Sequence, residues 1–138
     1  MARFLAVIVL FVALCQPVGA DEPVHIHVPD ETLNPPAGER VARRPLPAGQ
    51  HASCAIVRVL PEGRIARHKH VSHDEIIYVT RGKGRLQLGF QSIQVAPGDY
   101  IFVPAGTWHA FDNQSQSEVE VLSIFAPAFD GKDRVFSE

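Results

Sequence analysis

Residues 66–79 read ARHKHVSHDEIIYV and place three histidines and one glutamate within eight positions. On an extended strand, residues two apart point to the same side, so His68 and His70 share a face. Glu75 lies an odd number of positions beyond His70, but the polar VSHD between them can turn and return it to that face. The stretch therefore predicts two strands joined by a turn, with several metal-ligand types facing one interior.

The chain around this stretch consists of short apolar or alternating runs separated by turn residues, and none keeps a helical period long enough for a helix. Gly82 and Gly84 supply one reversal, and Pro97-Gly98-Asp99 supplies another. Seven such runs predict an all-β sandwich or barrel. They are SCAIVRVL (53–60), DEIIYVT (74–80), RLQLGF (85–90), IQVAPGD (93–99), YIFVPAG (100–106), WHAFDN (108–113) and EVEVLSIFAP (118–127).

Two groups of residues resemble the two sequence motifs of the cupin family across about residues 52–127. The first group is Gly63, His68, His70, Glu75 and Gly82, and the second is Gly98, Pro104, Gly106, His109 and Asn113. In one departure from the family pattern, four residues instead of the usual five separate Gly63 from His68. The resemblance implies a double-stranded β-helix, a jelly-roll barrel, that holds one metal through His68, His70, Glu75 and His109.

The first twenty residues have the pattern of a secretory signal peptide: MAR, then FLAVIVLFVALC, then the small residues VGA. The alternative, a membrane anchor, is disfavoured because the apolar run is shorter than the ~20 residues that span a bilayer. We expect cleavage near Ala20 and a secreted or periplasmic mature protein that has no membrane span.

Three further segments follow this leader. Residues 21–50 are proline-rich and are interpreted as an extended arm with at most a short strand at residues 24–28. His25 and His27 would share a face of that strand, but no third ligand lies nearby, so they are interpreted as polar residues of an edge strand and not as a second metal site. Residues 51–127 form the predicted cupin barrel. Residues 128–138 form a tail that contains Phe129 and Phe136. Three alternatives stay open for this tail: it folds back over the end of the barrel, it contacts a second subunit, or it is a loosely ordered terminus.

The composition points to a small-molecule partner. A formal net charge of −2 over 138 residues, without a basic stripe, favours neither nucleic acid nor an anionic membrane. Once the leader is removed, Cys54 is the one cysteine, so an internal disulfide is excluded and a buried thiol is expected.

Three imidazoles and one carboxylate suit Fe, Mn, Ni, Cu or Zn and leave one or two coordination positions open. A protein exported unfolded would load its metal outside the cytoplasm, where affinity order favours Cu and Zn. An open position favours an enzyme that acts on a small organic molecule, with a dioxygenase-like oxidoreductase preferred. The alternative is a non-catalytic periplasmic protein that binds metal or a small ligand.

No catalytic acid or base beyond the ligands is identified. The pocket candidates are Tyr78, Phe102, Trp108 and Phe111, of which Phe102 and Phe111 are expected inside the barrel. His73 is expected to face water or the mouth of the site, and Arg58 to face solvent. The resemblance to cupins, many of which pair through the outer sheet face and the N-terminal arm, implies a homodimer.

Overall fold

A computed structural model describes residues 23–28 and 33–138, so the signal-peptide prediction for residues 1–20 lies outside the described residues. The described chain contains ten strands, and no helix in it is long and apolar enough to cross a membrane. The strands are β1 (Val41–Pro45), β2 (Ser53–Val59), β3 (Arg64–His70), β4 (Asp74–Arg81), β5 (Gly84–Leu88), β6 (Gln91–Val95), β7 (Tyr100–Val103), β8 (His109–Asp112), β9 (Val119–Ala126) and β10 (Arg134–Phe136).

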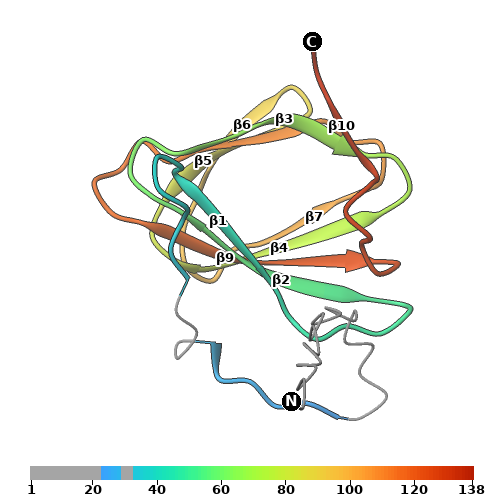
Figure 1. Cartoon of the computed structure of the whole chain (residues 1–138). Helices are drawn as coiled ribbons and strands as arrows, with labels where there is room; N and C mark the ends of the chain where they lie inside the picture. Colours follow the sequence, from blue (N-terminus) through green and yellow to red (C-terminus); the bar gives the residue numbers. More distant parts are fainter. Residues whose placement is uncertain (1–22, 29–32) are drawn as a thin grey trace, which may run out of the picture.

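These strands form two five-stranded antiparallel sheets that face each other as two layers (Figure 1). One sheet has the order β1-β2-β9-β4-β7, and the other has the order β10-β3-β8-β5-β6. From β2 to β5 and from β6 to β10 consecutive strands alternate between the layers, whereas β1 pairs with β2 and β5 pairs with β6 within one sheet. This is the arrangement of a jelly roll. The predicted all-β cupin fold is confirmed.

Alternation along the strands builds the core. Val57 lies opposite Val121, and Val121 lies opposite Val79, so all three point to the interior of the same sheet. A cluster of buried apolar residues, Val79, Leu86, Val95, Ile101 and Val103, joins the two layers inside the barrel. Gly82 has a φ of 76° and turns the chain between β4 and β5, as its position in the sequence predicts.

The two ends of the described chain are more ordered than the sequence pattern suggested. Residues 24–28 form no strand, whereas β1, within the predicted arm, pairs with β2 along its whole length. The predicted tail contributes β10, which pairs with β3. Both segments therefore complete the sheets as edge strands.

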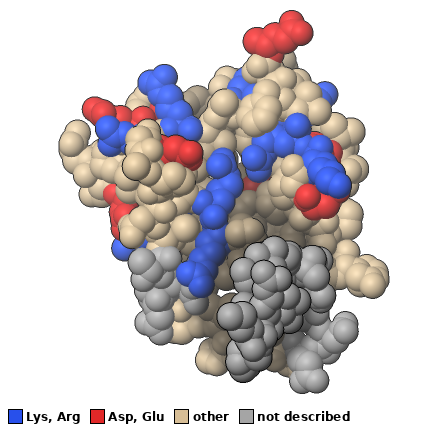
Figure 2. Space-filling model, viewed as in Figure 1, with Lys and Arg blue, Asp and Glu red and all other residues tan. Residues whose placement is uncertain are grey.

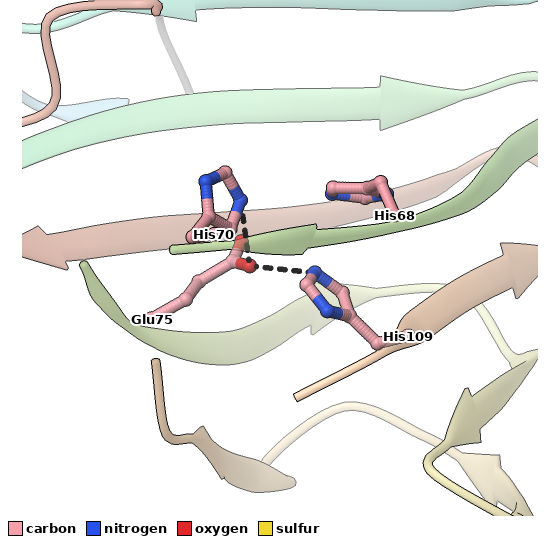
Figure 3. Close-up of side chains that lie close together, drawn as sticks. All are labelled: His68, His70, Glu75 and His109. Atoms are coloured by element: carbon pink, nitrogen blue, oxygen red, sulfur yellow. Dashed lines mark ion pairs between the residues drawn. The ribbon is translucent and has the colours of Figure 1, made fainter. Parts of the chain in front are cut away.

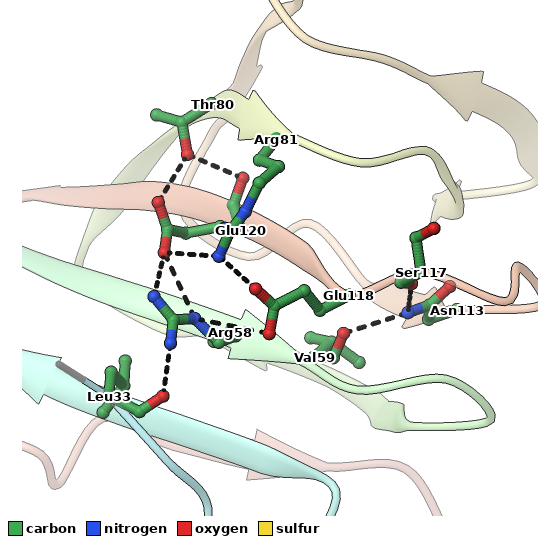
Figure 4. Close-up of polar contacts among 9 residues, drawn as sticks. All are labelled: Leu33, Arg58, Val59, Thr80, Arg81, Asn113, Ser117, Glu118 and Glu120. Atoms are coloured by element: carbon green, nitrogen blue, oxygen red, sulfur yellow. Dashed lines mark hydrogen bonds and ion pairs between the residues drawn. The ribbon is translucent and has the colours of Figure 1, made fainter. Parts of the chain in front are cut away.

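The prediction that Arg58 faces solvent is wrong. Its side chain is 14% exposed and its Nη2 lies 2.6 Å from Oε2 of Glu120, while its Nη1 donates to the carbonyl of Leu33 at 2.6 Å (Figure 4). Leu33 also packs with Ala42 and Ile56 on the outer face of the sheet. Arg58 points away from the barrel as predicted, but the arm covers it.

Asn113 shows why the second motif ends in an amide. The residue is fully buried, and its Nδ2 donates to the carbonyl oxygens of Val59 at 2.9 Å and Ser117 at 2.8 Å (Figure 4). Its backbone N–H donates to the carbonyl of Gly63 at 2.9 Å. Gly63 itself has no room for a Cβ, which would lie 2.7 Å from Val59 and 2.8 Å from the carbonyl of Leu60. Gly63 of the first motif and Asn113 of the second motif thus join two loops at one end of the barrel.

Candidate metal centre

Four side chains converge inside the barrel at the ends of three strands. His68 and His70 lie on β3, Glu75 on β4 and His109 at the start of β8 (Figure 3). The pleat of β3 directs both of its histidines inward, and the register sets His68 opposite His109. All four are buried, and one potential ligand atom from each lies within 4.8 Å of the others. The structure therefore brings together the four residues that the sequence predicted as ligands.

Backbone carbonyls orient two of the imidazoles. Nδ1 of His68 lies 2.7 Å from the carbonyl oxygen of Ala66, and Nδ1 of His109 lies 2.9 Å from that of Thr107. A ring nitrogen that faces a carbonyl carries the proton, so Nε2 of each ring keeps a lone pair for the centre of the site. The strand geometry thus selects the tautomer that a metal requires.

Glu75 turns one carboxylate oxygen toward the histidines. Its Oε2 lies 3.0 Å from Nε2 of His109 and 3.6 Å from Nε2 of His70 (Figure 3). Its other oxygen, Oε1, accepts a hydrogen bond from the buried hydroxyl of Ser123 on β9. Ser123 therefore fixes the carboxylate so that Oε2 is the oxygen available to a ligand.

The protonation states also suit metal binding. Burial lowers the pKa of His68 and of His70 to about 4, so both imidazoles are neutral at physiological pH. Burial alone would raise the pKa of Glu75, but the contacts with His109, Ser123 and His70 outweigh it and lower this pKa. Neutral imidazoles and an ionised carboxylate are the forms that coordinate a cation.

Several buried polar atoms of the site lack a hydrogen-bond partner, and a bound divalent metal would supply a partner by coordination. Oε2 of Glu75, Nε2 of His109 and both ring nitrogens of His70 are buried without a hydrogen-bond partner. Buried polar atoms are normally paired, and such unpaired atoms are costly unless an ion compensates those that face the centre of the site. Three nitrogens and one oxygen, without thiolate, form a donor set for a transition metal.

Next to the ligands lies a cavity of about 60 Å³ with a mostly apolar lining, which includes Val57, Ile77, Val79 and Phe111. Of the four pocket candidates, Phe111 lies here. Phe102 does not: it is 48% exposed on the outer face, because its neighbours Ile101 and Val103 occupy the interior positions of β7.

The other pocket candidates also lie elsewhere. Tyr78 is exposed on the outer face of β4, opposite Tyr100 of β7. Trp108 lies on the outside of β3, where the Arg67 guanidinium and the Lys69 ammonium are 5.1 Å and 4.8 Å from its ring. Tyr78, Phe102 and Trp108 were therefore predicted wrongly as pocket residues.

His73 is not exposed at the mouth as predicted. It is buried, forms an ion pair with Asp133 and packs edge-on against Phe129 at 5.4 Å. Phe129 also lies 5.0 Å from the ring of His70, and Phe136 lies 5.9 Å from that of His68. The C-terminal segment therefore covers one side of the metal centre.

Two residues of the site were missed from the sequence. Ser123 is the one polar residue on the inward face of β9, between Val121 and Phe125, so its position carried a signal. Arg43 lines the cavity from β1, a strand that the proline-rich composition had hidden.

Comparison with known proteins identifies relatives with the same fold. A sequence model described as the cupin domain matches residues 55–125. An uncharacterized protein of Aquifex aeolicus is 41% identical over 68 residues, which are 49% of this chain and 55% of the relative. Quercetin 2,3-dioxygenase of Bacillus subtilis is 38% identical over 74 residues, which are 50% of this chain and 22% of that enzyme. The matched part is thus little more than half of the first relative and a small fraction of the second.

Solved structures show the same architecture. KdgF from Halomonas sp. has a TM-score of 0.71 at 19% identity, with 79% of this chain and 97% of that chain covered. A double-stranded β-helix protein from Klebsiella pneumoniae has a TM-score of 0.72 at 21% identity, with 84% and 99% covered. At these identities the likeness establishes the fold alone.

Proposed function

This chain belongs to the cupin family, and we propose that it is a metal-dependent enzyme that oxidises a small organic molecule with dioxygen. The observation that carries the proposal is the convergence of four buried ligand atoms within 4.8 Å of one another, beside an apolar cavity. The name of the Bacillus subtilis relative, quercetin 2,3-dioxygenase, supports the reaction class.

A divalent metal held by these four residues would supply a Lewis acid with open positions for a substrate oxygen and, if redox-active, a centre for reaction with dioxygen. The chain's own residues prepare that chemistry. Burial keeps the imidazoles of His68 and His70 neutral, Glu75 provides one negative charge, and the apolar side chains of Val57, Ile77 and Val79 line the cavity beside them. In a dioxygenation both atoms of dioxygen enter the product, so no external reductant is needed.

The test is oxygen consumption by protein loaded separately with Fe, Mn, Ni or Cu. Quercetin, catechol, acetylacetone and phenylpyruvate serve as substrates, and the double variant His68→Ala/His109→Ala serves as the control. We expect one equivalent of dioxygen to disappear per equivalent of substrate in at least one pairing, and none in the control. Full metal occupancy without oxygen consumption in every pairing would contradict an oxidase or dioxygenase role.

A second candidate function is a non-catalytic protein that binds metal or a small ligand. Among the described residues that line the small cavity, Arg43 is the one ionisable residue that is not a proposed metal ligand. This scarcity of acids and bases favours binding without catalysis. A guanidinium stays protonated and is a poor general acid or base. Tight metal binding with ligand binding but no turnover would establish this alternative.

We also propose a homodimer formed through the outer face of β4 and β7. Tyr78, Tyr100 and Phe102 are 41%, 62% and 48% exposed there, side by side on neighbouring strands. Exposed aromatic clusters of this kind are typical of protein interfaces. Light scattering should give twice the chain mass for the wild type, and a monomer for Tyr100→Ser/Phe102→Ser; a monomeric wild type at micromolar concentration would contradict the proposal.

Export remains part of the proposal and is supported by the leader pattern of residues 1–20. Expression of the full chain in a bacterial host, followed by fractionation and N-terminal mass analysis, is the direct test. A periplasmic protein that begins at Asp21 is expected, and an intact chain in the cytoplasm would contradict export.

A further inference from the structure

Two arginines lie on the edge strands of the barrel, Arg43 on β1 and Arg134 on β10. The edge strands β1 and β10 belong to different sheets and lie at the front of Figure 1, one in each layer. Arg43 is opposite Val57, a residue of the cavity lining, and Arg134 is opposite His70. Directly opposed residues of antiparallel strands point to the same face, so both arginines lie on interior faces.

Within the described residues, neither guanidinium forms an ion pair with a carboxylate. The aromatic ring of Phe129 lies 5.5 Å from the guanidinium of Arg134, but this contact leaves the N–H groups free, and its Nε is buried without a hydrogen-bond partner. Arg43 keeps access to solvent while it lines the cavity.

The two positive charges also act on each other. Partial burial and then the charge of Arg134 lower the pKa of Arg43, whereas Glu75 acts in the opposite direction. Two nearby cations in a partly desolvated place repel each other, and an anion between them would relieve the repulsion. Lys and Arg side chains run down the middle of this face, beside a recess (Figure 2).

A larger cavity of about 300 Å³ adjoins the small one at this edge. Arg43, Val57 and Ser123 line both cavities, so the two cavities lie next to each other. The remaining lining is largely apolar and includes Phe125 and Phe129, whose rings stack at 4.7 Å. Asp130 is the charged residue of this lining besides Arg43. This volume is at the lower end of the range for small-molecule pockets.

We propose that Arg43 and Arg134 bind the carboxylate of a small organic acid whose apolar body lies against Phe125 and Phe129. The position between the cavities would place the acid's polar end beside Glu75 and the histidines. Arginine suits this role because its planar fork binds a carboxylate through two hydrogen bonds. The inference rests on the proposed function in that it names the substrate class of the same site.

The experiment is calorimetric titration of zinc-loaded and metal-free protein with benzoate and phenylpyruvate. Benzyl alcohol is the neutral analogue, and inorganic phosphate is the anion without an apolar body. Zinc content is measured first, so that a failure of the metal site is recognised separately. The variants are Arg43→Gln, Arg43→Lys and Arg134→Gln, and Arg85→Gln removes an exposed charge from β5 as the matched control.

We expect at least one acid to bind the wild type and the Arg85→Gln variant equally, and the alcohol not to bind. Loss of either inward arginine should weaken acid binding about ten-fold or more at unchanged zinc content, since charge-assisted hydrogen bonds are lost. Arg43→Lys should bind more tightly than Arg43→Gln. Three results would overturn the inference: no binding of either acid, acid binding by Arg43→Gln within twofold of the wild type, or phosphate binding as tight as acid binding.

Discussion

The hydroxyl of Ser123 donates a hydrogen bond to Oε1 of Glu75, and the other oxygen of that carboxylate lies 3.0 Å from Nε2 of His109. One serine on β9 thus sets the orientation of the single anionic ligand. Ser123→Ala should weaken metal binding about ten-fold, because loss of a partner that orients a ligand typically costs this much. Chelator competition measures the effect, with the exposed Ser92→Ala as the control. Unchanged affinity in Ser123→Ala would show that Glu75 is held by other contacts.

The metal-free protein should lose stability in mild acid. The pKa of His68 and of His70 falls from 6.5 in the unfolded chain to about 4 in the fold, so the unfolded chain binds more protons between these values. Their neutral state therefore favours folding fully above pH 6.5, and that advantage decreases as the pH falls toward 4. Urea unfolding at several pH values measures this, and His68→Gln should flatten the dependence. If the free energy of unfolding of His68→Gln depended on pH as steeply as that of the wild type, the assignment of this dependence to the buried histidines would be contradicted.

Asn113→Ala should destabilise the fold by about 3 kcal/mol, because it leaves two carbonyl acceptors without their donor inside the protein. The exposed Gln116→Ala is the matched control from the same loop and should change the free energy of unfolding little. Chemical denaturation distinguishes the two. Equal stability of both variants would mean that the amide is dispensable.

Arg58 and Glu120 form the main polar contact beneath the arm (Figure 4). Arg58→Met should cost about 2 kcal/mol, because Glu120 is 9% exposed and would lose its closer cationic partner at 2.6 Å, while Arg81 stays 3.5 Å away. The double variant Arg58→Met/Glu120→Leu should recover most of that loss. A double-mutant cycle by urea unfolding checks the coupling, and additive effects would contradict it.

The sequence predicted the fold and three of the ligands, His68, His70 and Glu75, because these depend on local pattern, whereas His109 was implied by the resemblance to cupins. Alternation along β3 fixes His68 and His70 on one face, and the polar turn before Glu75 allows its return to the interior. Turn residues such as Gly82 mark where strands reverse. These signals span a few residues each and do not depend on distant contacts.

The rest of the site depends on pairing between distant segments. Arg43 faces the cavity because β1 pairs with β2 in a register that sets it opposite Val57, and a proline-rich segment gives no sign of that. Arg134 similarly owes its position to the pairing of β10 with β3. Phe102 was placed inside because YIFVP is apolar throughout and has no polar residue to show which side faces water.

The measurement that tests the central claim most directly is elemental analysis of the protein purified from its own host. The double variant His68→Ala/His109→Ala, treated identically, is the control, and circular dichroism verifies its β-sheet content. We predict about one equivalent of a divalent transition metal per chain in the wild type and almost none in the folded variant. Equal metal content in the two proteins, or no metal in the wild type, would contradict a metal centre at these residues.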